Sequence, residues 1–131
     1  MNKLITTIAI FLTIGINAQT TIGKTENFEL TESRHGSYFL SFRDANYQIL
    51  NESDRVIIED IDKLYNIISK GISERVKGRL EYPTQTRGES LTISFNGKKV
   101  SLHLTHESGV SSYSYSLGQR QLNKVFNKQS K

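Results

Sequence analysis

The chain contains no cysteine, which excludes disulfide frameworks, thiolate metal sites, redox motifs and cysteine nucleophiles. It has a single proline, Pro83, and no apolar run of the roughly 20 residues that a membrane-spanning helix needs. It also lacks a large charge excess, with 17 Lys and Arg interspersed with 13 Asp and Glu. Because nucleic-acid-binding domains usually carry a dense basic face, this composition argues against nucleic acid as a partner.

The first 18 residues have the pattern of a secretory signal peptide. A positive start at Lys3 precedes an uncharged apolar run from Leu4 to Ile16, and a small residue follows at Ala18. We expect cleavage after Ala18, which makes the mature chain secreted or periplasmic, with no stable membrane insertion. Residues 19–25 are expected to be a flexible lead-in. Residues 26–131 are expected to form a single α+β domain, long enough to bury a core without disulfides.

Alternation of apolar and polar residues predicts half-buried strands. Asn96-Gly97 is a strong hairpin signal. Two registers keep apolar residues opposite each other, one pairing Ile93 with Val100 and the other pairing Phe95 with Val100. A short strand is also expected near Val76–Tyr82, inside the otherwise irregular Ile72–Glu89 segment. The main predicted strands cover residues 27–31, 38–43, 55–58, 91–95, 100–105 and 111–116.

Two segments have helical periodicity. The apolar residues of the first segment recur at i, i+3, i+4 and i+7, with Asp60 as N-cap and Lys70-Gly71 at the end. The second segment contains Leu122, Val125 and Phe126. The predicted fold is therefore α+β, with an antiparallel sheet of about five to six strands and two helices on one face. The element order also fits a duplicated βββα unit. The first helical stripe consists of Ile61, Leu64, Tyr65 and Ile68.

No complete catalytic set is visible, so we predict no catalytic residues, no metal and no cofactor. His103 and His106 are three residues apart, a spacing that points them to opposite faces of a strand. They could share a metal only if His106 already lies in the turn beginning at Glu107. The glutamate and aspartates near residue 60 are explained by helix capping.

The candidate binding residues lie on the polar face of the second-half strands: Thr92, Ser101, His103 and Thr105. Depending on the register, the cross-strand neighbour of His103 is Ser90 or Thr92. In the next strand, Tyr113 and Tyr115 are expected to point inward and the serines outward.

These features predict a non-enzymatic binding or accessory module that contacts another extracytoplasmic protein or a surface glycan. It would act through the polar sheet face or through the Ile72–Glu89 segment. One alternative is a small hydrolase-like enzyme that uses His103 with a neighbouring Ser or Thr. Another is a structural subunit of an envelope assembly, joined through an exposed strand edge.

Overall fold

The computed structural model describes residues 19–47 and 52–128, so the predicted signal peptide lies outside the described residues. In the first antiparallel sheet, the strands follow the order β1 (Gln19–Lys24), β2 (Phe28–Ser33), β3 (Tyr38–Arg43) and β4 (Ser53–Ile58). In the second sheet they follow the order β5 (Lys77–Tyr82), β6 (Ser90–Asn96), β7 (Lys99–Thr105) and β8 (Ser111–Tyr113). A short strand, β9 (Leu117–Gly118), also pairs with β7. The helices are η1 (Ala45–Tyr47), α2 (Ile61–Ser73) and α3 (Gln119–Val125).

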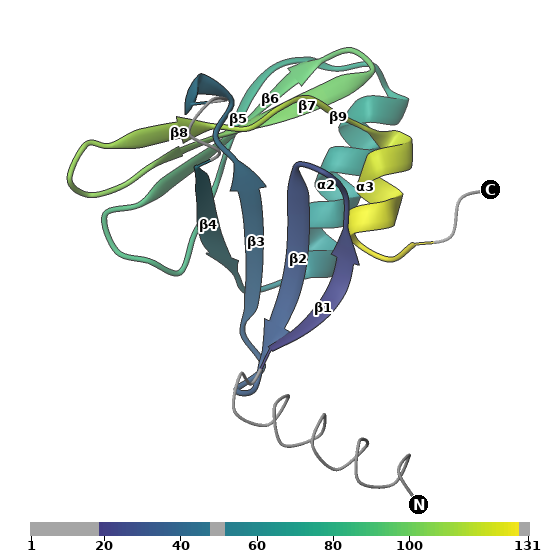
Figure 1. Cartoon of the computed structure of the whole chain (residues 1–131). Coiled ribbons are helices and arrows are strands. Elements are labelled where there is room, and N and C mark those ends of the chain that lie inside the picture. Colours follow the sequence, from purple (N-terminus) through teal and green to yellow (C-terminus); the bar gives the residue numbers. More distant parts are fainter. Residues whose placement is uncertain (1–18, 48–51, 129–131) are drawn as a thin grey trace, which may run out of the picture.

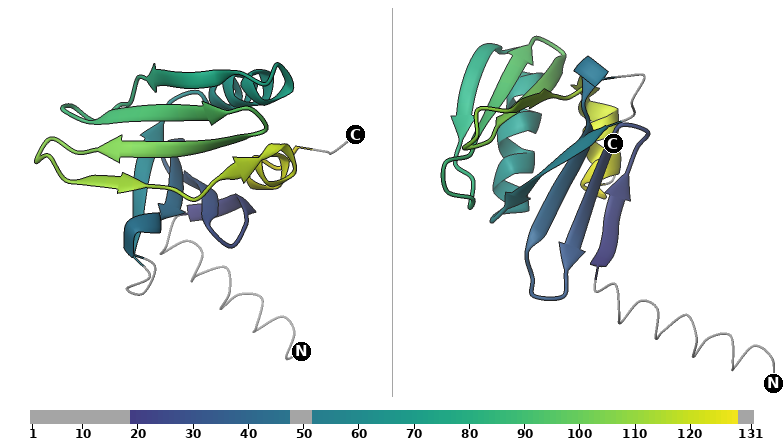
Figure 2. Two further views of the ribbon diagram at one scale, coloured as in Figure 1. Left: turned by 90° about the horizontal axis from the view of Figure 1, so that it is seen from above. Right: turned by 60° about the vertical axis from the view of Figure 1, so that its left-hand side comes forward.

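The two sheets cross steeply, and α2 and α3 stand side by side at one end of the crossing (Figure 1). Seen from above, the four main strands of the second sheet form a layer over the first sheet (Figure 2). The helices contact each other through polar groups as well as rings. The Tyr65 hydroxyl donates to Asn123 Oδ1 at 2.6 Å, and the Tyr65 and Phe126 ring centroids are 5.7 Å apart.

The α+β class, the antiparallel pairing and the two helices are confirmed, but the strands are divided between two sheets rather than joined in one. Strands β1 to β4 pair with one another, and strands β5 to β9 pair with one another. Helix α2 separates β4 from β5 along the chain. An amphipathic strand pattern specifies a buried face, but it does not specify whether that face is covered by a helix or by another sheet. The duplicated unit stays a prediction.

The expected flexible lead-in is instead strand β1, which pairs with β2. The sequence of β1 is rich in Gln, Thr and Gly and lacks the alternation of apolar and polar residues that predicts a strand. The strand is fixed by its backbone pairing and by α3, since a Cβ at Gly23 would overlap the Val125 carbonyl oxygen.

Both sheets and both helices contribute to one hydrophobic cluster. Complete burial of a large apolar side chain contributes about 1.5–3 kcal/mol, so this cluster is the main source of stability. Among the described residues, no helix is long and apolar enough to cross a membrane. The largest fully buried side chains include Leu30, Leu40, Phe42, Ile58, Leu64, Ile68, Leu91, Ile93, Leu102, Leu104 and Leu122.

The β6–β7 hairpin takes the register that pairs Phe95 with Val100. Asn96 pairs with Lys99, so the connecting residues are Gly97 and Lys98, and Gly97 has the positive φ of +74° that glycine tolerates. This register makes Thr92 the cross-strand neighbour of His103.

Helix α2 begins where predicted but ends later. The Asp60 carboxylate accepts the Lys63 N–H at 3.0 Å, as expected of an N-cap. Gly71 does not end the helix, which continues to Ser73, and the left-handed residue is Arg75 with φ of 53°. Gly71 is instead a contact point, because a Cβ there would overlap the Phe95 ring of β6.

We predict that Gly71→Ala lowers the free energy of unfolding by about 1–3 kcal/mol, because the added methyl overpacks the contact between α2 and β6. An exposed helical glycine would give the opposite sign, since alanine is the better helix former. Urea titration followed by circular dichroism measures the change. The control is Asn66→Ala on the exposed face of α2, which should be neutral or slightly stabilising. Stabilisation by Gly71→Ala would contradict the packing described here.

Candidate binding site

The outer face of the second sheet carries a shallow hollow of about 300 Å³. Two rows of directly paired residues cross the strands here. One row runs from Glu81 through Thr92 and His103 to Tyr113, and the other runs from Arg79 to Ser94 and Ser101. Strand pairing therefore brings together residues from four strands. We call this site the outer hollow; it is lined by Arg79, Glu81, Thr92, Ser94, Ser101, His103 and Tyr113.

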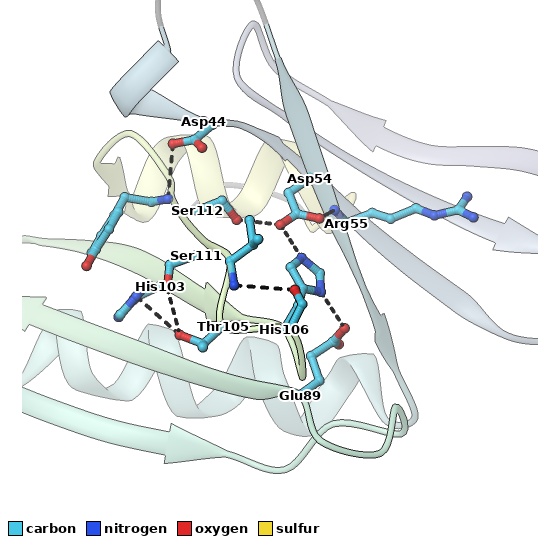
Figure 3. A network of polar contacts seen from close by, with 12 residues as sticks. Asp44, Asp54, Arg55, Glu89, His103, Thr105, His106, Ser111 and Ser112 are labelled. Carbon is cyan, nitrogen blue, oxygen red and sulfur yellow. Dashed lines mark hydrogen bonds and ion pairs between the residues drawn. The ribbon is translucent and has the colours of Figure 1, made fainter.

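Three of the four predicted binding residues line the outer hollow, namely Thr92, Ser101 and His103. Thr105, the fourth, is not among the lining residues, but its Oγ1 lies 3.3 Å from His103 Nε2. The same Oγ1 lies 3.2 Å from Ser111 Oγ (Figure 3). Thr105 therefore supports one edge of the His103 ring.

Tyr113 points outward, contrary to the prediction, and 44% of it is exposed. Its ring stacks on the His103 ring with centroids 4.1 Å apart and planes 10° from parallel. The serines expected outside, Ser112 and Ser114, are buried instead. Ser112 Oγ donates to Asp54 Oδ2, and Ser114 Oγ accepts the Leu102 N–H at 2.7 Å. The inward positions at Ser112 and Ser114 therefore meet polar groups of β4 and β7, which hydroxyls satisfy and tyrosine rings would not.

A second group of polar residues, which we call the inter-sheet cluster, consists of Asp54, Glu89, His106 and Ser112. His106 Nε2 lies 2.6 Å from Asp54 Oδ2, and its Nδ1 lies 3.2 Å from Glu89 Oε2 (Figure 3). Ser112 Oγ donates to the same Asp54 oxygen at 2.5 Å. Since Asp54 belongs to β4 and the other three residues to the second-sheet segment, these bonds join the two sheets.

A carboxylate on each ring nitrogen favours the protonated imidazolium of His106, because only that form donates from both nitrogens. The hydrogen bond with Asp54 raises the pKa of His106, partial burial opposes it, and Glu89 adds to the increase. Partial burial raises the pKa of Asp54, but hydrogen bonds from Ser112, His106 and the Arg55 N–H together outweigh it, so the net change is downward. Both shifts favour the charged pair of imidazolium and carboxylate over the neutral pair.

The inter-sheet cluster has a structural geometry rather than a nucleophilic one. Ser112 donates to Asp54 rather than to His106, and the hydrogen bonds that lower the pKa of Asp54 make this carboxylate a weak base for the serine proton. Among residues 19–47 and 52–128, no group of three or more His, Asp or Glu residues has an arrangement that could hold a metal ion. His106 follows β7 directly, and its contacts are with Asp54 and Glu89 rather than with His103.

Sequence reasoning missed Arg79, Glu81, Ser94 and Tyr113 in the outer hollow and all of the inter-sheet cluster. The first two could have been found from an alternating pattern in Lys77–Tyr82 and its pairing with β6. The bond between Asp54 in β4 and His106, just after β7, joins residues 52 positions apart, so no local signal could have revealed it.

Comparisons with protein-family models, with curated proteins and with solved structures find no significant match for this chain. The functional interpretation therefore comes from the geometry of the outer hollow itself.

We predict a pH dependence of stability that originates from His106. Its pKa is raised above the ordinary 6.5, so its contribution is complete below that pH and disappears as the pH rises through the higher folded-state pKa. The contribution of Asp54 is present above its ordinary 3.8 and is lost as the pH falls through its lower folded-state pKa. His106→Gln should cost about 1–3 kcal/mol near pH 5.5 and clearly less near pH 9.

Denaturant titrations of both proteins at the two pH values measure this difference. The control is His35→Gln, in an exposed turn. It should change the free energy of unfolding only slightly, and by the same amount at both pH values. A cost for His106→Gln that does not change with pH would contradict the imidazolium assignment.

Proposed function

We propose that this chain is an exported, non-enzymatic binding module and that the outer hollow binds a surface glycan. The observation that carries the proposal is the stacked pair His103 and Tyr113, set among hydroxyl and charged side chains in one concave site. Binding pockets commonly combine an aromatic surface with a few convergent polar groups.

The lining chemistry matches what a sugar offers to a protein. Thr92, Ser94 and Ser101 provide hydroxyls that donate and accept, and Arg79 and Glu81 provide a donor and an acceptor at one wall. The exposed part of Tyr113 provides an apolar surface for the C–H groups of a sugar ring. Tyrosine and serine together form adaptable contact surfaces in many binding proteins.

The size of the site favours a glycan over a folded protein partner. A standard protein interface buries about 800 Å² on each side and has an apolar centre. The outer hollow of about 300 Å³ is instead at the small end of the range for ligand pockets and is lined almost entirely by polar residues.

Export is proposed from the N-terminal sequence, in which a positive start, an apolar run and Ala18 follow in order.

The hydrolase alternative has one supporting contact, the 3.3 Å approach of Thr105 Oγ1 to His103 Nε2. However, the same threonine oxygen is shared with Ser111. In addition, His103 forms no ion pair with a carboxylate within the described part of the chain. An activated hydroxyl needs an oriented base, so the geometry supports binding better than acyl transfer.

We predict that alanine at His103 weakens glycan binding at least about tenfold, because it removes the ring on which Tyr113 stacks and empties the centre of the hollow. The measurement begins with a printed array of neutral and acidic bacterial oligosaccharides. Titration calorimetry with the best array ligand then compares the wild type with His103→Ala and with the triple variant Thr92→Ala, Ser101→Ala, His103→Ala.

The matched control is His35→Ala, the same substitution in the exposed β2–β3 turn, which should leave the affinity unchanged. Circular dichroism checks that all variants fold. Equal affinity of the wild type and the triple variant for the array ligand would place the binding site elsewhere.

We predict that the protein recovered from its host carries residues 19–131, because signal peptidase cuts after a small residue at the end of the apolar run. Intact-mass spectrometry of the envelope and medium fractions measures this. The control is Ala18→Leu, which should slow the cut and accumulate uncut chain. A wild-type mass that still includes residues 1–18 would contradict export with cleavage.

A further inference from the structure

The edge strand β5 is the starting point for an inference that does not depend on the glycan proposal. Five consecutive residues of β5, from Lys77 to Glu81, are exposed. The opposite edge strand of the same sheet, β8, is partly covered, since the Tyr113 N–H donates to Asp44 Oδ1 beside η1. Strand β5 therefore presents an accessible edge of the second sheet, and an accessible edge is a template for further pairing.

Backbone groups of β5 are oriented for such pairing. Gly97 N–H donates to the Val76 carbonyl at 3.0 Å, on the side of β6. Hydrogen-bonding direction alternates along an antiparallel strand, so Gly78 and Leu80 face β6, while the backbone groups of Arg79 and Glu81 face the open edge.

We propose that a second copy of this chain pairs with β5 to form a two-fold dimer, with the two second sheets joined in one continuous antiparallel sheet. A two-fold axis perpendicular to the sheet keeps outer faces together and inner faces together. The register centred on Leu80 sets Leu80 opposite Leu80 of the second copy. It also sets Arg79 opposite Glu81 twice, once on each side of the axis.

Charge complementarity selects this register over its neighbours. A register centred on Arg79 places two arginines opposite each other, and one centred on Glu81 places two glutamates opposite each other. Like charges in directly opposed positions destabilise a sheet, whereas opposite charges stabilise it. In the Leu80 register, Lys77 meets Pro83 rather than another cation, and Pro83 ends the pairing because it has no N–H.

On the inner side of the proposed dimer interface, the surroundings of Leu80 are apolar. A groove of about 390 Å³ lies between α2 and β5, and its walls include Ile67, Gly71, Val76 and Phe95. Leu80 is 43% exposed beside this groove and Val76 is 41% exposed. The two Leu80 side chains would meet over the two grooves and cover apolar surface that the single chain leaves in water. With one strand from each copy, the interface is at the small end of the size range, so we expect a weak dimer in exchange with the monomer.

The dimer would give the protein two adjacent sites. Arg79 and Glu81 line the outer hollow. In the proposed dimer they also form the charged pairs across the β5–β5 interface. The two outer hollows would therefore open on the same face of the joined sheet, next to each other across the two-fold axis. Two linked sites bind a repeating ligand more tightly than one site does.

The first test uses the absence of cysteine from the natural chain. Leu80→Cys introduces the sole thiol at the two-fold axis, where a non-hydrogen-bonded pair has Cα atoms about 4.5 Å apart, a separation that a disulfide can bridge. In a glutathione redox buffer we expect most of the folded variant to become a covalent dimer. Val110→Cys, in the 66% exposed β7–β8 turn, is the control and should stay monomeric. Equal crosslinking of the two variants, or a monomeric Leu80→Cys, would overturn the proposal.

The second test is a charge exchange followed by sedimentation velocity at up to about 0.5 mM protein without ligand. Arg79→Glu or Glu81→Arg alone creates like-charge pairs and should raise the dissociation constant at least about tenfold. The double variant restores opposite pairs and should return to the wild-type value. Wild-type protein that stays monomeric, or a folded double variant no better than the single ones, would overturn the proposal. Neither measurement involves a glycan, so failure here leaves the proposed function standing, and the converse also holds.

Discussion

The rest of the structure depends on the burial of two apolar sheet faces in one core. Neither the first nor the second sheet could leave its inner face in water, and α2 and α3 are too short to cover both. The sheets therefore cross and share the helices, so that Leu40 of β3 and Leu102 of β7 belong to the same cluster. Because the inner faces are used in this way, the outer face of the second sheet keeps its polar residues, and there the strand pairing assembles the outer hollow.

The two ends of the sheet crossing are closed by different chemistry. At the helical end, apolar side chains and the bond between Tyr65 and Asn123 fill the space between the sheets. At the other end, β4 approaches β8, and the contact is made by Asp54, His106 and Ser112. Hydroxyls and an ion pair take the place of an apolar seam there, which explains why β8 turns Ser112 inward and leaves Tyr113 for the outer face.

The sequence predicted those features whose information is local. Alternation identified β2, β3, β6 and β7, and the N-cap and apolar stripe identified α2. Three residues of the outer hollow, Thr92, Ser101 and His103, were predicted because alternation places them on the polar face of the β6–β7 hairpin. The sequence could not give the separation into two sheets, the phase of β8 or the bond between Asp54 and His106, since these depend on contacts between distant segments. Strand β1 was missed because its backbone, not its side chains, holds it in the sheet.

Arg79 and Glu81 connect the two proposals physically, because they form a wall of the outer hollow and also lie on the open edge of β5. The β5 edge is free in the monomer and paired in the dimer. A ligand that binds these two forms with different affinities shifts the equilibrium between monomer and dimer to the extent of that difference. A glycan held by Thr92, His103 and Tyr113 leaves Arg79 and Glu81 free to pair across the dimer interface, and a glycan that spans two adjacent hollows favours the dimer. A glycan that instead takes its hydrogen bonds from Arg79 and Glu81 competes with the dimer interface and favours the monomer. The direction of coupling between ligand binding and dimer formation therefore reports whether the ligand binds at His103 and Tyr113 or at the wall formed by Arg79 and Glu81.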